Sequence, residues 1–406
     1  MFAAKVRVAV LATVIGVVLV AGVAVAVSFG PAGPAHSAAA AAAPKRTAQP
    51  AGQPSAGPAG PLRVLSISPG NGAGQVNGAG PVQVVFSAPL APTSPLPTFS
   101  PSVAGSWHAA SGGTHAASGG TIVFTPTTPF EPGTAVTLRI PAGASGVRSA
   151  TGGLLENPAT AAFQTGGWST LRLEQLLAQL GYLPLSWAPL RSSARTTQAS
   201  GGPAPVSYAA QLGAVYAPPA GAFTWPAGYP SELTSQWQPG APSQILTGAL
   251  MAFQVDQGLP MTGVATSDVW HSVFQAVAKG QDNPHGYSFA LGNKATPETL
   301  TVWHEGKEVF HGLTNSGISV SPTVDGTFPV YLRYLNQVMK GANPDGSKYA
   351  DPVQYVSYFN GGDAVHSYYR PSYGYPQSLG CLELPLSSAE QVWPYLTYGT
   401  LVTVTG

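Results

Sequence analysis

The chain has 406 residues, of which 44% are hydrophobic and only 8% are charged, and its formal net charge is +1. The hydrophobic content argues against disorder, and without a block of Lys and Arg there is no electrostatic footprint of a nucleic-acid-binding protein. One cysteine, Cys381, excludes an intramolecular disulfide framework. A chain of this length is expected to form two or three domains.

An apolar segment follows the first positive charges. Lys5 and Arg7 precede an uncharged run, residues 8–27, that is rich in Val, Ala and Leu. Roughly 20 such residues suffice to span a bilayer as a helix, and the positive flank favours an N-terminus on the inner side. We therefore expect residues 1–30 to be either a membrane anchor or a signal peptide that is cut near Ser37. Both alternatives place the rest of the chain outside the cytoplasm.

Residues 31–61 are a tract of Pro, Ala and Gly, which we interpret as a linker. Residues 62–166 then show short β-branched runs with turns rich in Gly, Pro and Asn between them, a pattern typical of a β-sandwich. The runs span residues 62–67, 82–86, 121–124 and 135–140. The segment resembles bacterial immunoglobulin-like wall domains.

The hydrophobic period becomes helical from Leu171. It predicts helices over residues 171–180, from Gln244 onward and over residues 267–277, whereas residues 190–240 are predicted to be irregular. The phrases LLAQLGY and AFQVDQGL, which begin at residues 176 and 252, resemble the small helical peptidoglycan-binding module. We expect residues 167–282 to form such a module with an insertion.

A β pattern returns over residues 283–406. Strands are predicted at residues 287–291, 299–304, 309–313 and 401–404. Glu305, Gly306 and Lys307 predict a hairpin turn. The expected fold is therefore multidomain and mainly β, with a sandwich, a small helical module and a C-terminal β domain.

The other noteworthy histidines do not indicate a metal site. His108 and His115 are copies within a seven-residue repeat, residues 108–121, which we interpret as a hairpin loop with exposed histidines. His304 and His311 flank the predicted hairpin. A structural zinc site needs about four ligands close together, so we expect no metal.

Cys381 and His366 form the strongest chemical signal. A thiol attacks an acyl carbon as its thiolate, and a histidine is suited to remove the proton because its ordinary pKa lies near neutral pH. Gly380 precedes the cysteine and allows a backbone conformation that turns N–H groups toward a developing oxyanion. A Gly-Cys pair with an upstream histidine therefore predicts a nucleophilic cysteine.

The surrounding motifs resemble the catalytic domain of the L,D-transpeptidases. That family carries a His-Ser pair, then a variable stretch, then Ser-His-Gly-Cys, and it also has a Pro-Thr-x-x-Gly-Thr-Phe phrase. The matching segments are His366-Ser367, residues 378–381 (Ser378, Leu379, Gly380 and Cys381) and residues 322–328. In this chain Leu379 replaces the second histidine of the motif, and Glu383 stands where an Arg often follows the cysteine.

The resemblance implies a mechanism that needs no cofactor. His366 would take the proton of Cys381, whose thiolate would attack a stem peptide and expel its terminal D-Ala. The side-chain amine of a second stem would resolve the thioester and give a 3→3 cross-link. The carbonyl of Ser367 would orient His366, and the N–H groups of Gly380 and Cys381, with Leu379, would hold the oxyanion.

The resemblance also implies the partners and the compartment. These are donor and acceptor stem peptides of peptidoglycan, with carbapenem-type β-lactams as inhibitors, at the cell wall or the outer face of the cytoplasmic membrane. We expect Tyr355, Tyr368 and Arg370 to contact substrate. Two alternatives stay open: an L,D-carboxypeptidase in which water is the acceptor, and a wall-binding scaffold whose catalytic site has decayed.

Overall fold

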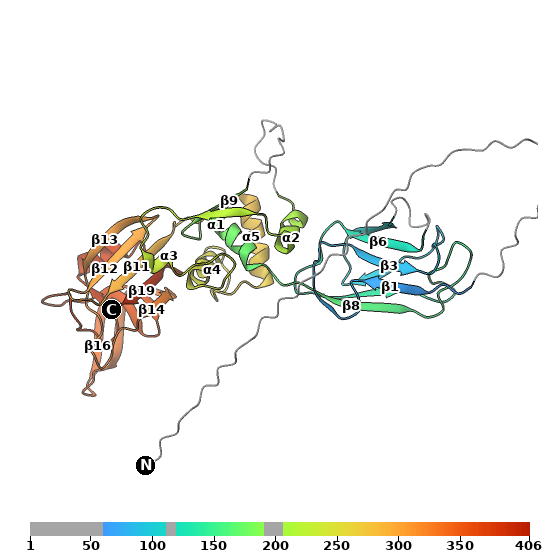
Figure 1. Ribbon diagram of the computed structural model, residues 1–406. Helices are drawn as coiled ribbons and strands as arrows, with labels where there is room; N and C mark the ends of the chain where they lie inside the picture. Colours follow the sequence, from blue (N-terminus) through green and yellow to red (C-terminus); the bar gives the residue numbers. More distant parts are fainter. Residues whose placement is uncertain (1–59, 111–118, 191–205) are drawn as a thin grey trace, which may run out of the picture. The chain divides into compact units, whose positions relative to one another are not determined.

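A computed structural model describes residues 60–110, 119–190 and 206–406 of the chain (Figure 1). These residues form mainly β-strands. Along the chain, a set of helices follows one β-rich part and precedes another, which confirms the predicted mainly β fold. The predicted anchor or signal peptide and nearly all of the linker lie outside the described residues. Within the described part, no helix has the length and apolar character needed to cross a membrane.

The N-terminal part is a sandwich of two sheets, in which most strand pairs are antiparallel. Its first sheet has the strand order β1-β3-β6-β5, with bounds Val64–Ser68, Val82–Phe86, Thr121–Pro126 and Gly105–Ala109. Its second sheet has the order β2-β8-β7-β4, with bounds Ala73–Val76, Ala159–Thr165, Ala135–Ile140 and Thr98–Ser100. Along β3 the buried residues Val82, Val84 and Phe86 alternate with outward positions. This period of two turns one face of each sheet inward to a shared core.

The first histidine of the repeat lies in a strand. His108 lies in β5, and its Nε2 is 2.9 Å from Thr125 Oγ1 on the paired strand β6. The prediction of an exposed loop histidine is wrong at this position, because strand pairing extends into the first copy of the repeat. His115 lies outside the described residues.

Helices dominate the middle of the chain. They are α1 (Thr170–Gln179), α2 (Tyr208–Tyr216), α3 (Ser231–Thr234), α4 (Gln244–Asp256) and α5 (Ser267–Lys279). Side chains of Ser169, Ser243 and Thr266 cap α1, α4 and α5 by accepting a backbone N–H from the first turn. Gly280 ends α5 in the left-handed conformation. The three predicted helices are thereby confirmed.

The stretch predicted to be irregular, residues 190–240, contains regular elements. Helices α2 and α3 lie there, and β9 (Ser186–Pro189) pairs with β10 (Gly221–Thr224). The prediction was wrong because these elements are short. In α2 only Gln211, Leu212 and Val215 are buried, and three positions are too few to show a helical period.

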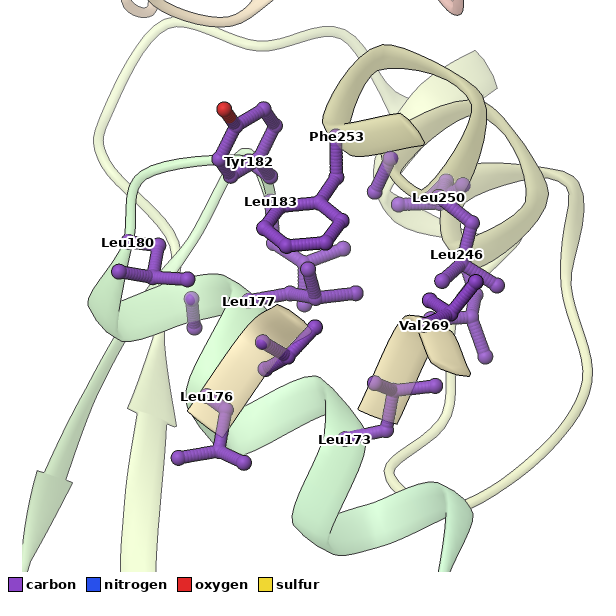
Figure 2. Packing of buried hydrophobic residues seen from close by; sticks show 14 of the residues in the cluster. Leu173, Leu176, Leu177, Leu180, Tyr182, Leu183, Leu246, Leu250, Phe253 and Val269 are labelled. Atoms are coloured by element: carbon purple, nitrogen blue, oxygen red, sulfur yellow. The ribbon is translucent and has the colours of Figure 1, made fainter. Parts of the chain in front are cut away.

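A hydrophobic core joins the helices (Figure 2). Leu173, Leu176 and Leu177 of α1 belong to one cluster with apolar side chains of α4. The Tyr182 ring lies edge-on to the Phe253 ring, with the ring centres 5.3 Å apart. The same cluster includes Phe289 and Leu401, which belong to strands of the C-terminal sheet. Burial of apolar surface thus links the helices and that sheet.

The C-terminal part holds two sheets around a core of their own. The five-stranded sheet has the order β13-β12-β11-β19-β14, with bounds Lys307–Leu313, Thr299–His304, Ser288–Asn293, Leu401–Thr405 and Gly326–Pro329. The other sheet has the order β15-β16-β17-β18, with bounds Leu332–Ala342, Lys348–Asn360, Asp363–Ser367 and Leu382–Leu384. Helix α6 (Leu386–Val392) follows β18. Val302, Val365, Leu382 and Val402 are among the side chains packed between the sheets.

The four strands predicted in this part are present as β11, β12, β13 and β19. The predicted hairpin turn is confirmed as well, since Glu305 and Gly306 both have positive φ, 50° and 75°, between β12 and β13. The second sheet was not predicted, although it carries the residues of the candidate site.

Phe289 tests the shared core. Its side chain is fully buried between the helices and the sheet, so Phe289→Ala is expected to lower the free energy of unfolding by about 3–5 kcal/mol. Urea denaturation followed by tryptophan fluorescence would measure the change. Leu335→Ala is the control, because Leu335 is 53% exposed, and it should cost no more than about 0.5 kcal/mol. Equal effects of the two substitutions would contradict the shared core.

Candidate active site

The parallel pairing of β17 with β18 brings His366 and Cys381 together. Val365 is opposite Leu382 and His366 is opposite Glu383, so Cys381, one residue earlier, is level with Ala364. Side chains two positions apart on a strand share a face. His366 and Ala364 are therefore on one side of the sheet, and His366 and Cys381 both line a cavity of about 640 Å³.

His366 is arranged as a proton acceptor. The side chain is buried, and its Nδ1 is 2.9 Å from the carbonyl oxygen of Ser367. Because a carbonyl only accepts, Nδ1 carries the hydrogen and Nε2 has the free lone pair. Burial lowers the pKa of His366, while the bond to Ser367 and the charge of Glu383 oppose that shift. The imidazole is thus held neutral near neutral pH.

Cys381 is held as a neutral thiol. Its Sγ is 3.8 Å from the carbonyl oxygen of Gly362, to which it donates a weak hydrogen bond. Burial raises the pKa of the thiol to about 12, the backbone of Ala364 opposes this, and the charges of Asp363 and Glu383 add to it. A thiol of this kind attacks only if a base removes its proton at that moment.

Ser378 shapes the turn before the nucleophile. Its hydroxyl donates to the Cys381 carbonyl at 2.6 Å and accepts from the N–H of Gly380 at 3.2 Å. Gly380 has φ of 123°, a conformation that L side chains rarely adopt. The carbonyl of Leu379 accepts from Ser321 Oγ at 2.9 Å. The Gly380 N–H is therefore already bonded within the turn, which leaves it less suited to the oxyanion role expected for it.

The Pro-Thr phrase, residues 322–328, contacts this turn through Gly317. Thr323 Oγ1 accepts from the N–H of Gly317 at 2.9 Å, and Gly317 pairs with Ser378 in a short parallel bridge. A Cβ at Gly317 would lie 2.9 Å from the Gly380 nitrogen. The phrase at residues 322–328 thus acts on the cysteine turn through close backbone packing.

Arg370 and Glu383 form a two-pronged ion pair. Arg370 Nε is 2.8 Å from Glu383 Oε2, and its Nη2 is 2.9 Å from Oε1 and also donates to the Gln377 carbonyl. The Glu383 side chain is only 6% exposed. Glu383, which departs from the family pattern, is therefore paired with Arg370. Arg370 lines the cavity and its guanidinium lies 4.6 Å from the Tyr368 ring centre.

A β-bulge decides which tyrosines face the cavity. Tyr349, Asp351 and Val353 line it from β16, and after a register shift between Gln354 and Ser357 the lining residue is Tyr358. One extra residue in a strand moves the following side chains to the other face. Tyr368 lines the cavity as expected. Tyr355 does not, since it sits in the bulge with φ of 58° and its ring packs near Trp393 at 6.0 Å.

No metal-binding arrangement is found among the described residues, where no three side chains of His, Cys, Asp or Glu are grouped to hold an ion. His304 Nδ1 is 3.0 Å from Ser288 Oγ, and His311 Nδ1 is 2.9 Å from Thr301 Oγ1. Each ring is thus bonded to a neighbouring strand.

Family comparison identifies the part of the chain that holds this site. Residues 289–404 match the model of the L,D-transpeptidase catalytic domain, and residues 59–165 match that of a bacterial Ig-like domain. The chain carries an L,D-transpeptidase catalytic domain. Cys381 and His366 lie inside the residues that match the transpeptidase domain. The match supports a transpeptidase activity. No curated protein matches the chain significantly.

Solved structures similar to this chain include three transpeptidases. An L,D-transpeptidase from Mycobacterium smegmatis is 14% identical, with 85% of this chain and 100% of that chain covered and a TM-score of 0.27. L,D-transpeptidase 3 from Mycobacterium tuberculosis is also 14% identical, with 84% and 98% covered and a TM-score of 0.28. The catalytic domain of the E. faecium L,D-transpeptidase is 26% identical, with 29% and 96% covered and a TM-score of 0.27.

Gly380→Ala tests the turn before the cysteine of the transpeptidase domain. The added Cβ would collide with Asp363 Oδ1 and would force a strained φ. We expect at least a tenfold change in the rate at which Cys381 reacts with a thiol-specific alkylating reagent. Gly346→Ala is the control, because Gly346 has φ of 84° but no atom near the added Cβ. An unchanged rate in Gly380→Ala would show that the turn does not govern the thiol.

Proposed function

We propose that this protein is an exported L,D-transpeptidase that forms 3→3 peptidoglycan cross-links through a thioester on Cys381. The observation that carries the proposal is the neutral His366 imidazole, whose Nδ1–H is bound to Ser367 and whose Nε2 is free to accept a proton. It shares one cavity with the only cysteine of the chain. This pairing lies within the matched transpeptidase domain.

The proposed first step is acylation. His366 takes the thiol proton while Sγ bonds to the carbonyl carbon of the third stem residue. The C–N bond to the terminal D-Ala then breaks, and His366 returns the proton to the leaving amine. The N–H groups of Cys381 and Leu379 are proposed to hold the oxyanion, because the Gly380 N–H is bonded to Ser378.

The proposed second step is transfer. The side-chain amine of an acceptor stem attacks the thioester carbon while His366 takes a proton from the nitrogen, and His366 passes that proton to the sulfur as the C–S bond breaks. Water in place of the amine would give the carboxypeptidase reaction. Both outcomes share the same acyl-enzyme, so the product distinguishes them.

The remaining parts are proposed to place the enzyme at the wall. The Ig-like domain would act as a spacer, and the helical part would bind peptidoglycan or support the catalytic domain through the core shared with Phe289 and Leu401. The N-terminal segment would either anchor the chain to the membrane or direct its export.

β-Lactams of the carbapenem class are the proposed inhibitors. Related transpeptidases have been solved in complex with imipenem and acylated by ertapenem. A carbapenem presents a strained amide carbonyl, which the thiolate of Cys381 would attack without needing an acceptor amine.

Carbapenem labelling tests the proposal directly. The purified protein, incubated with a carbapenem, should gain the mass of one carbapenem, and Cys381→Ala should gain none. His366→Ala should be acylated at least about 100-fold more slowly than the wild type, because general base catalysis typically contributes 10²–10⁴-fold. Intact-mass spectrometry over time provides the rates.

Tyr355→Phe is the matched control, since Tyr355 is in the same domain but does not line the cavity, and it should label like the wild type. A folded wild-type protein that gains no mass would overturn the enzyme proposal and favour the decayed scaffold.

A further inference from the structure

An unassigned carboxylate lies beside the proposed nucleophile. Asp363 is the first residue of β17 and follows the tight turn Gly361-Gly362. The carbonyl oxygen of Gly362 accepts a hydrogen bond from the Cys381 thiol. A Cβ at Gly380 would collide with Asp363 Oδ1 and lie 3.1 Å from its Cγ. The carboxylate therefore packs against the bare Cα of Gly380 and lines the cavity together with Cys381.

Asp363 has little compensation for its charge. Among the described residues its carboxylate accepts one hydrogen bond, a long one of 3.5 Å from Asn360 Nδ2. None of the ion pairs among the described residues includes it. Two cations line the same cavity: Arg370 is engaged by Glu383, and Lys340 forms none of these ion pairs with Asp363. Burial raises the pKa of Asp363 to about 6. Such a group is stabilised when a cation enters the cavity.

The charge of Asp363 also affects the thiol. It contributes to the raised pKa of Cys381, so an unpaired carboxylate opposes formation of the thiolate. A bound cation next to Asp363 removes part of that cost. Occupancy of this position and the reactivity of Sγ are thereby coupled.

We propose that Asp363 receives the side-chain ammonium of the acceptor stem and selects an amine over water as the acceptor. The inference rests on the proposed transpeptidase function. The attacking nitrogen must approach within about 3–3.5 Å of the acyl carbon bonded to Sγ, and Asp363 is the unpaired anion packed against the cysteine turn. A water molecule gains no comparable charge interaction there.

The protons balance without a further reactant. The acceptor enters as an ammonium with three protons, and one is released to solvent. His366 takes the second as the C–N bond forms and gives it to sulfur as the C–S bond breaks. The third stays on the new amide nitrogen, while Asp363 orients the nitrogen.

The test compares Asp363→Asn with the wild type, with a tetrapeptide stem as donor and a tripeptide stem with a diamino acid at its third position as acceptor. The substitution should raise the acceptor KM at least tenfold and increase the ratio of hydrolysed to cross-linked product. Carbapenem acylation, which needs no acceptor, should not fall by more than about threefold. Asp363→Glu should recover part of the cross-linking.

Glu308→Gln is the control, because Glu308 is an exposed carboxylate of β13 in the same domain that does not line the cavity, and its acceptor KM should stay within twofold of the wild type. An unchanged acceptor KM and product ratio in Asp363→Asn would overturn the inference, as would loss of carbapenem acylation in that variant, which would mark the residue as structural. Absence of both cross-links and adduct in the wild type would instead overturn the transpeptidase proposal.

Discussion

The parallel pairing of β17 with β18 is the constraint on which the candidate site depends. It places Cys381, which directly precedes β18, level with Ala364, two positions before His366, and it places Glu383 opposite His366. A slip of one residue would turn His366 to the opposite face, where Val365 packs in the core between the sheets. The burial of Val365, Leu382 and Leu384 therefore maintains the register that aligns the proposed base with the proposed nucleophile.

Neutral resting states characterise this pair. Burial raises the pKa of the thiol and lowers the pKa of the imidazole, so an ion pair between the two side chains is disfavoured. The proton is then proposed to move only as the acyl carbon is attacked. Asp363 strengthens this state by its negative charge, and a cationic substrate would weaken it, which would restrict reactivity to the occupied site.

At both departures from the family pattern, local contacts keep the backbone around Cys381 in place. Glu383 is matched by Arg370, and both lie against the cavity. Leu379 has lost the polar side chain of the family motif, but its carbonyl is held by Ser321 and the turn keeps the Ser378 bonds. The backbone that surrounds the cysteine thus depends on hydroxyl groups and glycines, which this chain retains.

The sequence alone determined the elements with strong periodicity and supplied the candidate residues of the site. Helices α1, α4 and α5 and strands such as β3 and β12 follow from their apolar spacing and caps, and the Gly-Cys pair with an upstream histidine predicted the proposed nucleophile and base. These features depend on neighbours along the chain. The tertiary structure decided the short elements of residues 206–240, the bulge that turns Tyr355 away, the Arg370–Glu383 pair and the approach of Asp363 to Gly380. Each of these depends on pairing between distant segments, whose register comes from burial in a common core and leaves no signal in the local sequence.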